Sequence, residues 1–180
     1  MTQIIHQHFT FDDKWNARFM QLAQVASTWS KDKSTQVGSV IVSPKKEILS
    51  MGYNGFPRGV DDNVPERHER PTKYEFVVHA EANALLNAGR NGTRLDGGVL
   101  YVTMPPCARC AGFIVQSGIK EVIYLEPEIQ KQIPGWRDTL NISFTMFNES
   151  SVIYKSLPRE YALSQNILNQ IKALHNSFIK

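Results

Sequence analysis

The feature that most restricts the fold of this 180-residue chain is an alternation of apolar runs and a helical segment between residues 98 and 127. The runs "GVLYVT" and "EVIYLEP" are rich in β-branched and aromatic residues, which is typical of strands buried on both faces. Between them, "CARCAGFIVQSG" has apolar residues at helical spacing and stops at Gly118. Strand, helix and strand in this order predict a parallel βαβ unit, and therefore an α/β protein.

The segments before this unit extend the same architecture. Apolar side chains at helical spacing follow an acidic pair and predict a helix over residues 13–29. "VGSVIVSP" and "EILSMGYN" predict two strands joined by a short turn. Residues 55–74 have no period and predict a long loop, of a length that is usually functional or disordered. A helix is then expected from about His79 to Asn87, ended by Gly89.

Beyond the βαβ unit, the sequence predicts three more elements. "GWRDTLNISFTMFNESSVIY" indicates one more helix and a short strand. After Pro158, apolar residues from Tyr161 to Phe178 form a stripe at helical spacing, which indicates a terminal helix. This helix could pack on its own domain or on a neighbouring subunit.

Composition excludes several classes of protein. Hydrophobic residues at 42% and charged residues at 21% are typical of a globular domain, and no apolar run approaches the roughly 18 residues of a membrane span. The first residues lack the features of a secretory signal, so we expect a cytoplasmic protein without a membrane partner. A net charge of +3 without clustered Lys and Arg argues against a polynucleotide partner.

Two ionisable side chains interrupt the apolar run "VVHAEANALL". His79 and Glu81 lie two positions apart where the pattern predicts a core. A buried charge has to be paired, bound to a metal or neutralised, because its desolvation costs several kcal/mol. A buried histidine on its own would most often be a hydrogen-bonded core residue, so the choice depends on the rest of the chain.

The only two cysteines, in "PPCARC", provide the partners. Cys107 and Cys110 follow a predicted strand and begin a predicted helix, whose N-terminus favours thiolates. Their spacing is typical of a metal pair or of a redox pair. Two sulfurs and the imidazole of His79 would give zinc three protein ligands and leave one position open, as in catalytic zinc sites. Glu81 could then move protons to and from a water there, whereas a redox pair would leave Glu81 without a role.

These residues belong to motifs that resemble the cytidine deaminase superfamily, and within it the deoxycytidylate deaminases. The motifs are "WSKDKSTQVGSVIV", "GYNGFPRGVDD", "HAEANALLNAGR" and "YVTMPPCARCAGFIVQSGIKEVIY". H-x-E followed by P-C-x-x-C is the signature of zinc nucleobase deaminases. The resemblance implies a three-layer α/β/α fold with a mixed sheet, flanking helices and an extra C-terminal helix. It implies a deaminase domain over residues 1–157 and a helical extension over 158–180.

The same resemblance implies an activity and assigns roles to residues. The activity is hydrolytic deamination of dCMP to dUMP and ammonia with Zn²⁺, held by His79, Cys107 and Cys110, and with Glu81 as proton shuttle. The backbone of Ala80 would contact the base and Asn54 would lie near the sugar, where a carboxamide can donate to or accept from a hydroxyl. The residues expected to hold the phosphate are Ser30, Lys31 and Thr35, although a solvated basic turn is an equal alternative. The positions expected for a nucleoside triphosphate effector are Gly52, Gly55, Arg58 and Arg90. A homo-oligomer, with a hexamer suspected, is also expected.

Several alternatives stay open at this stage. The substrate could be another cytosine nucleotide or nucleoside, or a tRNA base held by the same zinc site. A non-catalytic module stabilised by zinc is a third interpretation, which leaves the position of Glu81 unexplained. Many relatives carry a tyrosine near the substrate where this chain has Glu126, so a different ring, Phe56 or Trp136, is expected to stack on the base.

Overall fold

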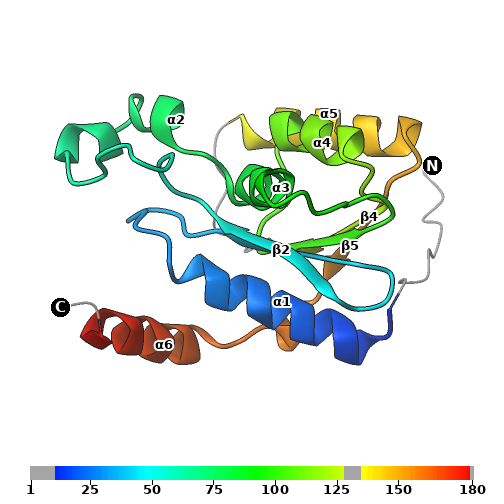
Figure 1. Ribbon diagram of the computed structural model, residues 1–180, viewed down its shortest axis with the longest axis horizontal. Helices are drawn as coiled ribbons and strands as arrows, with labels where there is room; N and C mark the ends of the chain where they lie inside the picture. Colours follow the sequence, from blue (N-terminus) through cyan, green and yellow to red (C-terminus); the bar gives the residue numbers. More distant parts are fainter. Residues whose placement is uncertain (1–10, 128–134, 179–180) are drawn as a thin grey trace.

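The structure is a computed structural model in which residues 11–127 and 135–178 are described. A five-stranded sheet lies between two layers of helices (Figure 1). The strands are β1 (Gly38–Val42), β2 (Ile48–Tyr53), β3 (Val99–Val102), β4 (Glu121–Leu125) and β5 (Ile153–Leu157). The α-helices are α1 (Asp13–Ser27), α2 (Lys73–Phe76), α3 (Ala80–Arg90), α4 (Ala108–Gln116), α5 (Trp136–Glu149) and α6 (Gln165–Phe178). Two short 3-10 helices are η1 (Pro65–His68) and η2 (Arg159–Tyr161).

The strand order is β2-β1-β3-β4-β5, with β1 antiparallel to both of its neighbours and β3, β4 and β5 parallel. Helix α4 connects β3 to β4, which confirms the βαβ unit predicted from the sequence. Helices α3, α4 and α5 lie on one side of the sheet, and α1 and α6 lie on the other (Figure 1). The observed layers confirm the expected three-layer α/β/α architecture with a mixed sheet.

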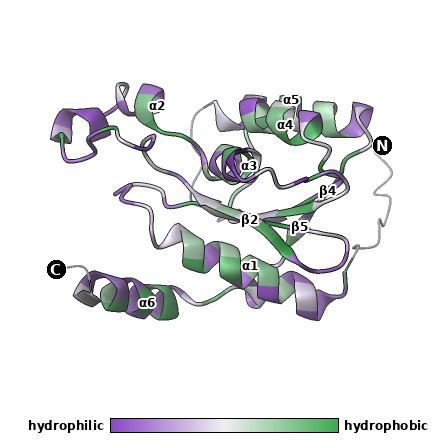
Figure 2. Ribbon diagram, in the orientation of Figure 1, coloured by the Kyte–Doolittle hydropathy of each residue, from purple (hydrophilic) through white to green (hydrophobic). Residues whose placement is uncertain are grey.

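The central strands are buried on both faces, so each contributes to two cores. Leu100 and Val102 belong to the core under α3, α4 and α5, whereas Val99 and Tyr101 belong to the core against α1. Successive side chains of a strand point to opposite faces, which explains this division. The strands accordingly appear largely in the green of hydrophobic residues (Figure 2).

The helices begin in two different ways. Helix α1 has a conventional N-cap, because the Asp12 carboxylate accepts a hydrogen bond from the backbone N–H of Trp15 (3.0 Å). The N-cap residues of α3 and α4 are His79 and Cys107, and neither side chain makes a capping hydrogen bond. Their side chains are therefore available for another purpose.

Helix α3 runs to Arg90, so the expectation that it extends to about Asn87 and is stopped by Gly89 is wrong. A glycine inside a helix costs only about 1 kcal/mol relative to alanine, and the packing of α3 on β2 exceeds this cost. The helix ends where Gly92 takes a φ of 65°, a left-handed conformation that favours glycine. Gly52 of β2 permits the close packing, because a Cβ atom there would lie 2.3 Å from the carbonyl oxygen of Ala80.

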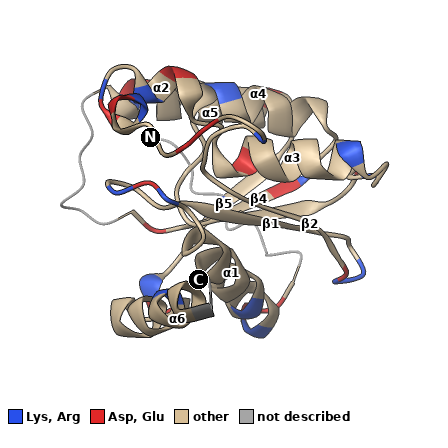
Figure 3. Cartoon of the chain, turned by 60° about the vertical axis from the view of Figure 1, so that its left-hand side comes forward, with Lys and Arg blue, Asp and Glu red and all other residues tan. Residues whose placement is uncertain are grey.

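The segment between β2 and α3 contains η1 and α2, where the sequence predicted only a loop. These elements are four residues each, too short to produce a detectable period. The segment is largely hydrophilic (Figure 2), with acidic and basic residues interspersed (Figure 3). Its ends are fixed by reciprocal backbone hydrogen bonds between Gly55 and Val78.

The C-terminal segment packs on α1. The Gln24 side chain bonds both the N–H and the carbonyl of Leu163, at 2.7 and 3.3 Å, and Gln21 donates to the carbonyl of Tyr161. Helix α6 then lies beside α1, on the side of the sheet away from α3 and α4 (Figure 1). None of the helices in the described part of the chain is both long and apolar enough to cross a membrane.

Candidate zinc deaminase active site

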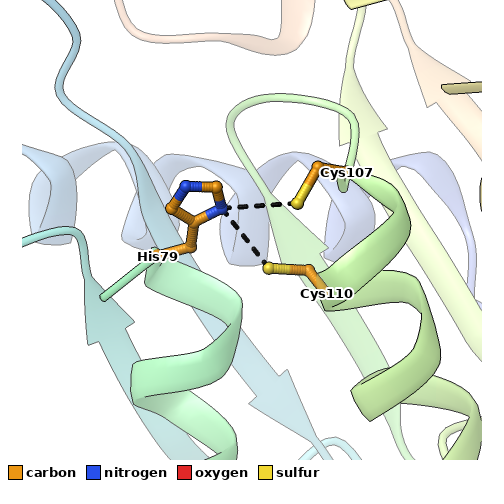
Figure 4. Close-up of side chains that lie close together, drawn as sticks. All are labelled: His79, Cys107 and Cys110. Atoms are coloured by element: carbon orange, nitrogen blue, oxygen red, sulfur yellow. Dashed lines mark hydrogen bonds between the residues drawn. The ribbon is translucent and has the colours of Figure 1, made fainter. Parts of the chain in front are cut away.

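Three side chains from two helix starts converge above the sheet (Figure 4). His79 Nδ1 lies 3.5 Å from the Sγ atom of Cys107 and 3.5 Å from the Sγ atom of Cys110. His79 precedes α3, Cys107 precedes α4 and Cys110 lies in the first turn of α4. Both cysteines are free thiols, so the redox-pair alternative has no disulfide to support it.

The distances match those of a zinc site. Zinc–sulfur and zinc–nitrogen bonds of about 2.3 and 2.1 Å that meet at the tetrahedral angle place the two ligand atoms about 3.6 Å apart. The observed nitrogen–sulfur distances are 3.5 Å, and all three ligand atoms lie within 4.8 Å of one another. Three protein ligands leave one coordination position open, as a catalytic zinc requires.

The electrostatics of the thiols favour a cation. A hydrogen bond from Cys110 and the neighbouring His79 lower the pKa of Cys107 against the effect of burial. Hydrogen bonding with Cys107, followed by burial, raises the pKa of Cys110. One thiolate therefore forms readily, and the second forms when a cation binds, since a metal displaces the thiol proton.

Glu81 is buried beside the ligand cluster, with 4% of its surface exposed. Burial raises the pKa of its carboxyl group to about 7, although the charge of His79 opposes the shift. In the absence of the metal, Glu81 therefore holds and releases a proton near neutral pH. Such a pKa suits a general acid and base.

A cavity of about 440 Å³ opens in front of the cluster. His79 and Glu81 line it, and so do Asn54 and Thr35, two of the residues expected to contact the substrate. Four residues that the sequence singled out therefore line the same cavity. Trp136 also lines it, whereas Phe56 stacks on His68, with ring centroids 4.7 Å apart, and lies outside it. Of the two rings considered for base stacking, only Trp136 lines the cavity, and stacking by Trp136 stays a prediction.

Asn54 also organises the wall of this cavity. Its Oδ1 accepts a hydrogen bond from the N–H of Val37 at 2.8 Å, and its Nδ2 donates to the carbonyl of Thr35 at 2.9 Å. A carboxamide oxygen accepts two hydrogen bonds, so Oδ1 keeps one lone pair for a sugar hydroxyl. The contact of Asn54 with the sugar stays a prediction.

Of three other expected substrate contacts, Ser30 and Lys31 lie away from the cavity, and Ala80 lies between two cavity residues. Ser30 is buried and donates to the carbonyl of Asn54 (2.8 Å), and it does not line the cavity. Lys31 is exposed and forms an ion pair with Asp62 (2.8 Å), also outside the cavity. The carbonyl of Ala80 accepts a hydrogen bond from Ser39, so its N–H, at the start of α3, is the group left for a ligand.

The positions expected for an effector do not line this cavity. Gly52 is packed under α3, and Gly55 pairs with Val78. Arg58 donates to the Asn87 side chain (2.8 Å), and Arg90 is exposed in the last turn of α3. An effector role for these positions stays a prediction.

The sequence interpretation missed three cavity residues in the predicted loop over residues 55–74. Arg70, Lys73 and Tyr74 line the cavity, and they come from the region without periodicity. The basic residues there are interspersed with acidic ones, so the sequence does not distinguish paired cations from available ones. No signal in a single sequence would have selected them.

An ion pair joins this segment to the loop before β1. Lys73 Nζ lies 2.6 Å from Asp32 Oδ2, and the two side chains are 11% and 7% exposed. Burial raises the pKa of Asp32, but hydrogen bonds from Lys73 and from the backbone N–H groups of Ser34 and Thr35 outweigh it, so the pKa is lower than usual. This pair stabilises the fold at every pH at which Asp32 is ionised.

Asp32→Asn should lower the free energy of unfolding by about 3 kcal/mol at pH 7, because it leaves the Lys73 ammonium buried without its carboxylate. A carboxyl group with a lowered pKa in the folded state stabilises above its unfolded pKa, and this contribution disappears as the pH falls through the folded value. The difference between variant and parent should therefore be constant above about pH 5 and shrink below pH 4.

Urea unfolding at several pH values measures this difference. Asp62→Asn is the matched control, because its partner Lys31 is 65% exposed. An exposed pair contributes less than about 1 kcal/mol. Equal losses in the two variants at pH 7 would contradict the role given to the Asp32–Lys73 pair.

Comparison with known proteins identifies the family. The family described as the cytidine and deoxycytidylate deaminase zinc-binding region matches residues 13–126. The chain belongs to this family of zinc-dependent hydrolytic deaminases. Zinc is the cofactor that the name of the family specifies, and the cluster of His79, Cys107 and Cys110 fits it.

Individual relatives are similar over most of the chain. An uncharacterized deaminase from the luxG 3′ region of Aliivibrio fischeri is 41% identical over 145 residues, which cover 81% of this chain and 95% of the relative. Human deoxycytidylate deaminase is 37% identical over 147 residues, which cover 79% of each chain. The crystal structure of dCMP deaminase from the cyanophage S-TIM5 in complex with dCMP and dUMP has a TM-score of 0.67 and 25% identity, and covers 82% of this chain and 99% of the phage chain.

Proposed function

We propose that this protein converts dCMP and water into dUMP and ammonia. The observation that carries the proposal is one cavity lined by His79, Glu81, Asn54 and Thr35, in front of the cysteine pair. In this proposal the cytosine base would lie beside Glu81, and a sugar hydroxyl would donate to the free lone pair of Asn54. Support for a deoxyribonucleoside monophosphate comes from the relatives named as deoxycytidylate deaminases and from the phage enzyme bound to dCMP and dUMP.

Zinc, when bound by His79, Cys107 and Cys110, supplies a Lewis acid that makes water nucleophilic near neutral pH. Glu81 accepts a proton from the attacking water at its carboxylate and donates it to the ring nitrogen of cytosine. Once the water oxygen has bonded to the carbon that carries the amino group, Glu81 accepts the remaining proton of that hydroxyl and donates it to the amino group. The C–N bond then breaks, ammonia leaves and the hydroxyl oxygen becomes the carbonyl oxygen of uracil. One carboxylate therefore acts as base and then as acid, and this requires a pKa near the working pH. The buried position of Glu81 limits its contact with bulk water.

A panel of substrates tests the proposal. Ammonia release is measured from cytidine, deoxycytidine, their mono- and triphosphates, and a cytosine oligonucleotide, with zinc-loaded protein. The highest kcat/KM is expected for dCMP. A preference for the oligonucleotide would favour a polynucleotide deaminase, and no release from any member of the panel would favour a non-catalytic zinc module.

Three features of the proposed enzyme rest on its resemblance to the family. These are a homo-oligomer, with a hexamer suspected, a nucleoside triphosphate effector, and a cytoplasmic location. The mass of the assembly in solution tests the oligomer, and a titration of activity with nucleoside triphosphates tests the effector.

A further inference from the structure

The cavity in front of the zinc ligands has a positively charged side. Arg70 and Lys73 line it, and the same two residues, with Asp32, also line a neighbouring cavity of about 610 Å³. A nucleoside monophosphate whose base lies at Glu81 would need a cation at the other end of the cavity for its phosphate. The question is which of these side chains has its donors available.

Lys73 is already engaged. Its ammonium group donates to Asp32 Oδ1 at 2.8 Å and to the Ser34 hydroxyl at 2.6 Å, and 11% of the side chain is exposed. The charges of Lys73 and Asp32 compensate each other. This pair therefore builds the wall of the cavity and adds little net charge to it.

Lys31, the cation that the sequence suggested for the phosphate, is also engaged. It lies 2.8 Å from Asp62 and lines the neighbouring cavity of about 610 Å³, not the one that contains His79 and Glu81. Binding of the substrate phosphate by Lys31 would require it to leave its partner Asp62.

Arg70 differs from both lysines. Over the described ranges 11–127 and 135–178, no carboxylate lies within ion-pair distance of its guanidinium group. Its Cζ atom lies 5.8 Å from the ring centroid of Tyr74, another cavity residue. A ring face holds the guanidinium plane without using its N–H donors, and a fork of parallel donors matches the oxygens of a phosphate.

We propose that Arg70 binds the 5′-phosphate of the substrate and so makes the enzyme select nucleoside monophosphates over nucleosides. This assignment rests on the proposed function and adds the residue that determines its specificity. The phosphate would lie at the boundary of the two cavities, where Arg70 is shared between them. The Asp32–Lys73 pair keeps the segment that carries Arg70 against the cavity.

The test measures kcat and KM of Arg70→Ala with dCMP and with deoxycytidine. A charge-assisted hydrogen bond to phosphate predicts a loss of about 10- to 150-fold in kcat/KM for dCMP, mainly through KM. The loss for deoxycytidine should be at least about tenfold smaller, because a nucleoside lacks the phosphate. Arg70→Lys should recover part of the activity with dCMP, since it restores the charge but not the planar fork.

Controls separate a local role from a general one. Arg94→Ala removes an exposed arginine, paired with Asp96 at 2.9 Å, and should leave both substrates unaffected. Lys31→Ala tests the rival position, and a loss of dCMP selectivity there that equals the loss in Arg70→Ala overturns the proposal. A parallel loss for both substrates in Arg70→Ala also overturns it, because that result indicates a structural role.

The dissociation constant of dUMP, compared with that of deoxyuridine, gives a readout without turnover. Arg70→Ala should weaken dUMP binding and change deoxyuridine binding much less. Failure of the proposed function would appear in the parent protein, as no deamination of dCMP. Failure of the Arg70 assignment would appear as unchanged discrimination between dUMP and deoxyuridine in the variant.

Discussion

Glu81→Gln should lower kcat for dCMP by at least about 100- to 10,000-fold, the range attributed to general acid–base catalysis. The amide has nearly the same shape as the carboxyl group but cannot accept and return a proton. Glu81 is not among the three residues proposed to hold the metal, so the variant should keep about one zinc per chain. Steady-state ammonia release and metal analysis of the same preparation measure both quantities.

Glu75→Gln is the matched control, because Glu75 is an exposed carboxylate of α2 outside the cavity. It should retain the parent rate. A near-normal rate in Glu81→Gln would remove Glu81 from the mechanism. Loss of zinc together with activity would instead show that Glu81 maintains the metal site.

Cys107→Ser should abolish measurable deamination and release zinc, since a serine hydroxyl is a poor ligand for this ion. Loss of the metal should also destabilise the fold, because a ligand that binds only the native state adds its binding energy to folding. At free zinc about 1,000-fold above the dissociation constant, that contribution is about 4 kcal/mol. For a chain of this size it corresponds to a fall of about 8–16 °C in Tm.

Thermal unfolding with and without a chelator checks this interpretation. The chelator should lower the Tm of the parent protein to that of Cys107→Ser and should leave the variant unchanged. His79→Ala should behave in the same way, because it removes the third ligand. Identical Tm values for parent and variant in excess zinc would contradict a metal held by these residues.

The sequence predicted the elements that have a clear hydrophobic period. The strand "GVLYVT" appears as β3, "EVIYLEP" as β4 and the cysteine helix as α4. The same pattern predicted where the three proposed metal ligands lie. A strand followed directly by a helix places Cys107 and Cys110 at the start of that helix, and His79 lies at the start of another predicted helix. The predicted ends of the helices were less accurate. Helix α3 continues through Gly89, because its packing on β2 compensates for the low helix propensity of glycine.

The phosphate end of the cavity was less predictable. Lys31 lies in a basic loop that suggested anion binding, yet it is paired with Asp62, a residue about thirty positions away in the sequence. Arg70 and Lys73 lie in a segment without period. Only the tertiary structure shows that Lys73 is paired with Asp32, whereas Arg70 has no carboxylate partner among the residues that the structure describes. Pairings between distant charged residues leave no trace in composition or spacing.

The absence of side-chain caps at the starts of α3 and α4 limits how this protein can be stabilised. Replacing a poor N-cap by Ser, Asp or Asn commonly contributes about 0.5–2 kcal/mol. At these two helices the residues concerned are His79 and Cys107, so the usual substitution would remove a metal ligand. Thermostable variants of this enzyme should therefore carry their improvements at other positions, and the first turns of both helices should stay less stable than the scaffold until the metal binds.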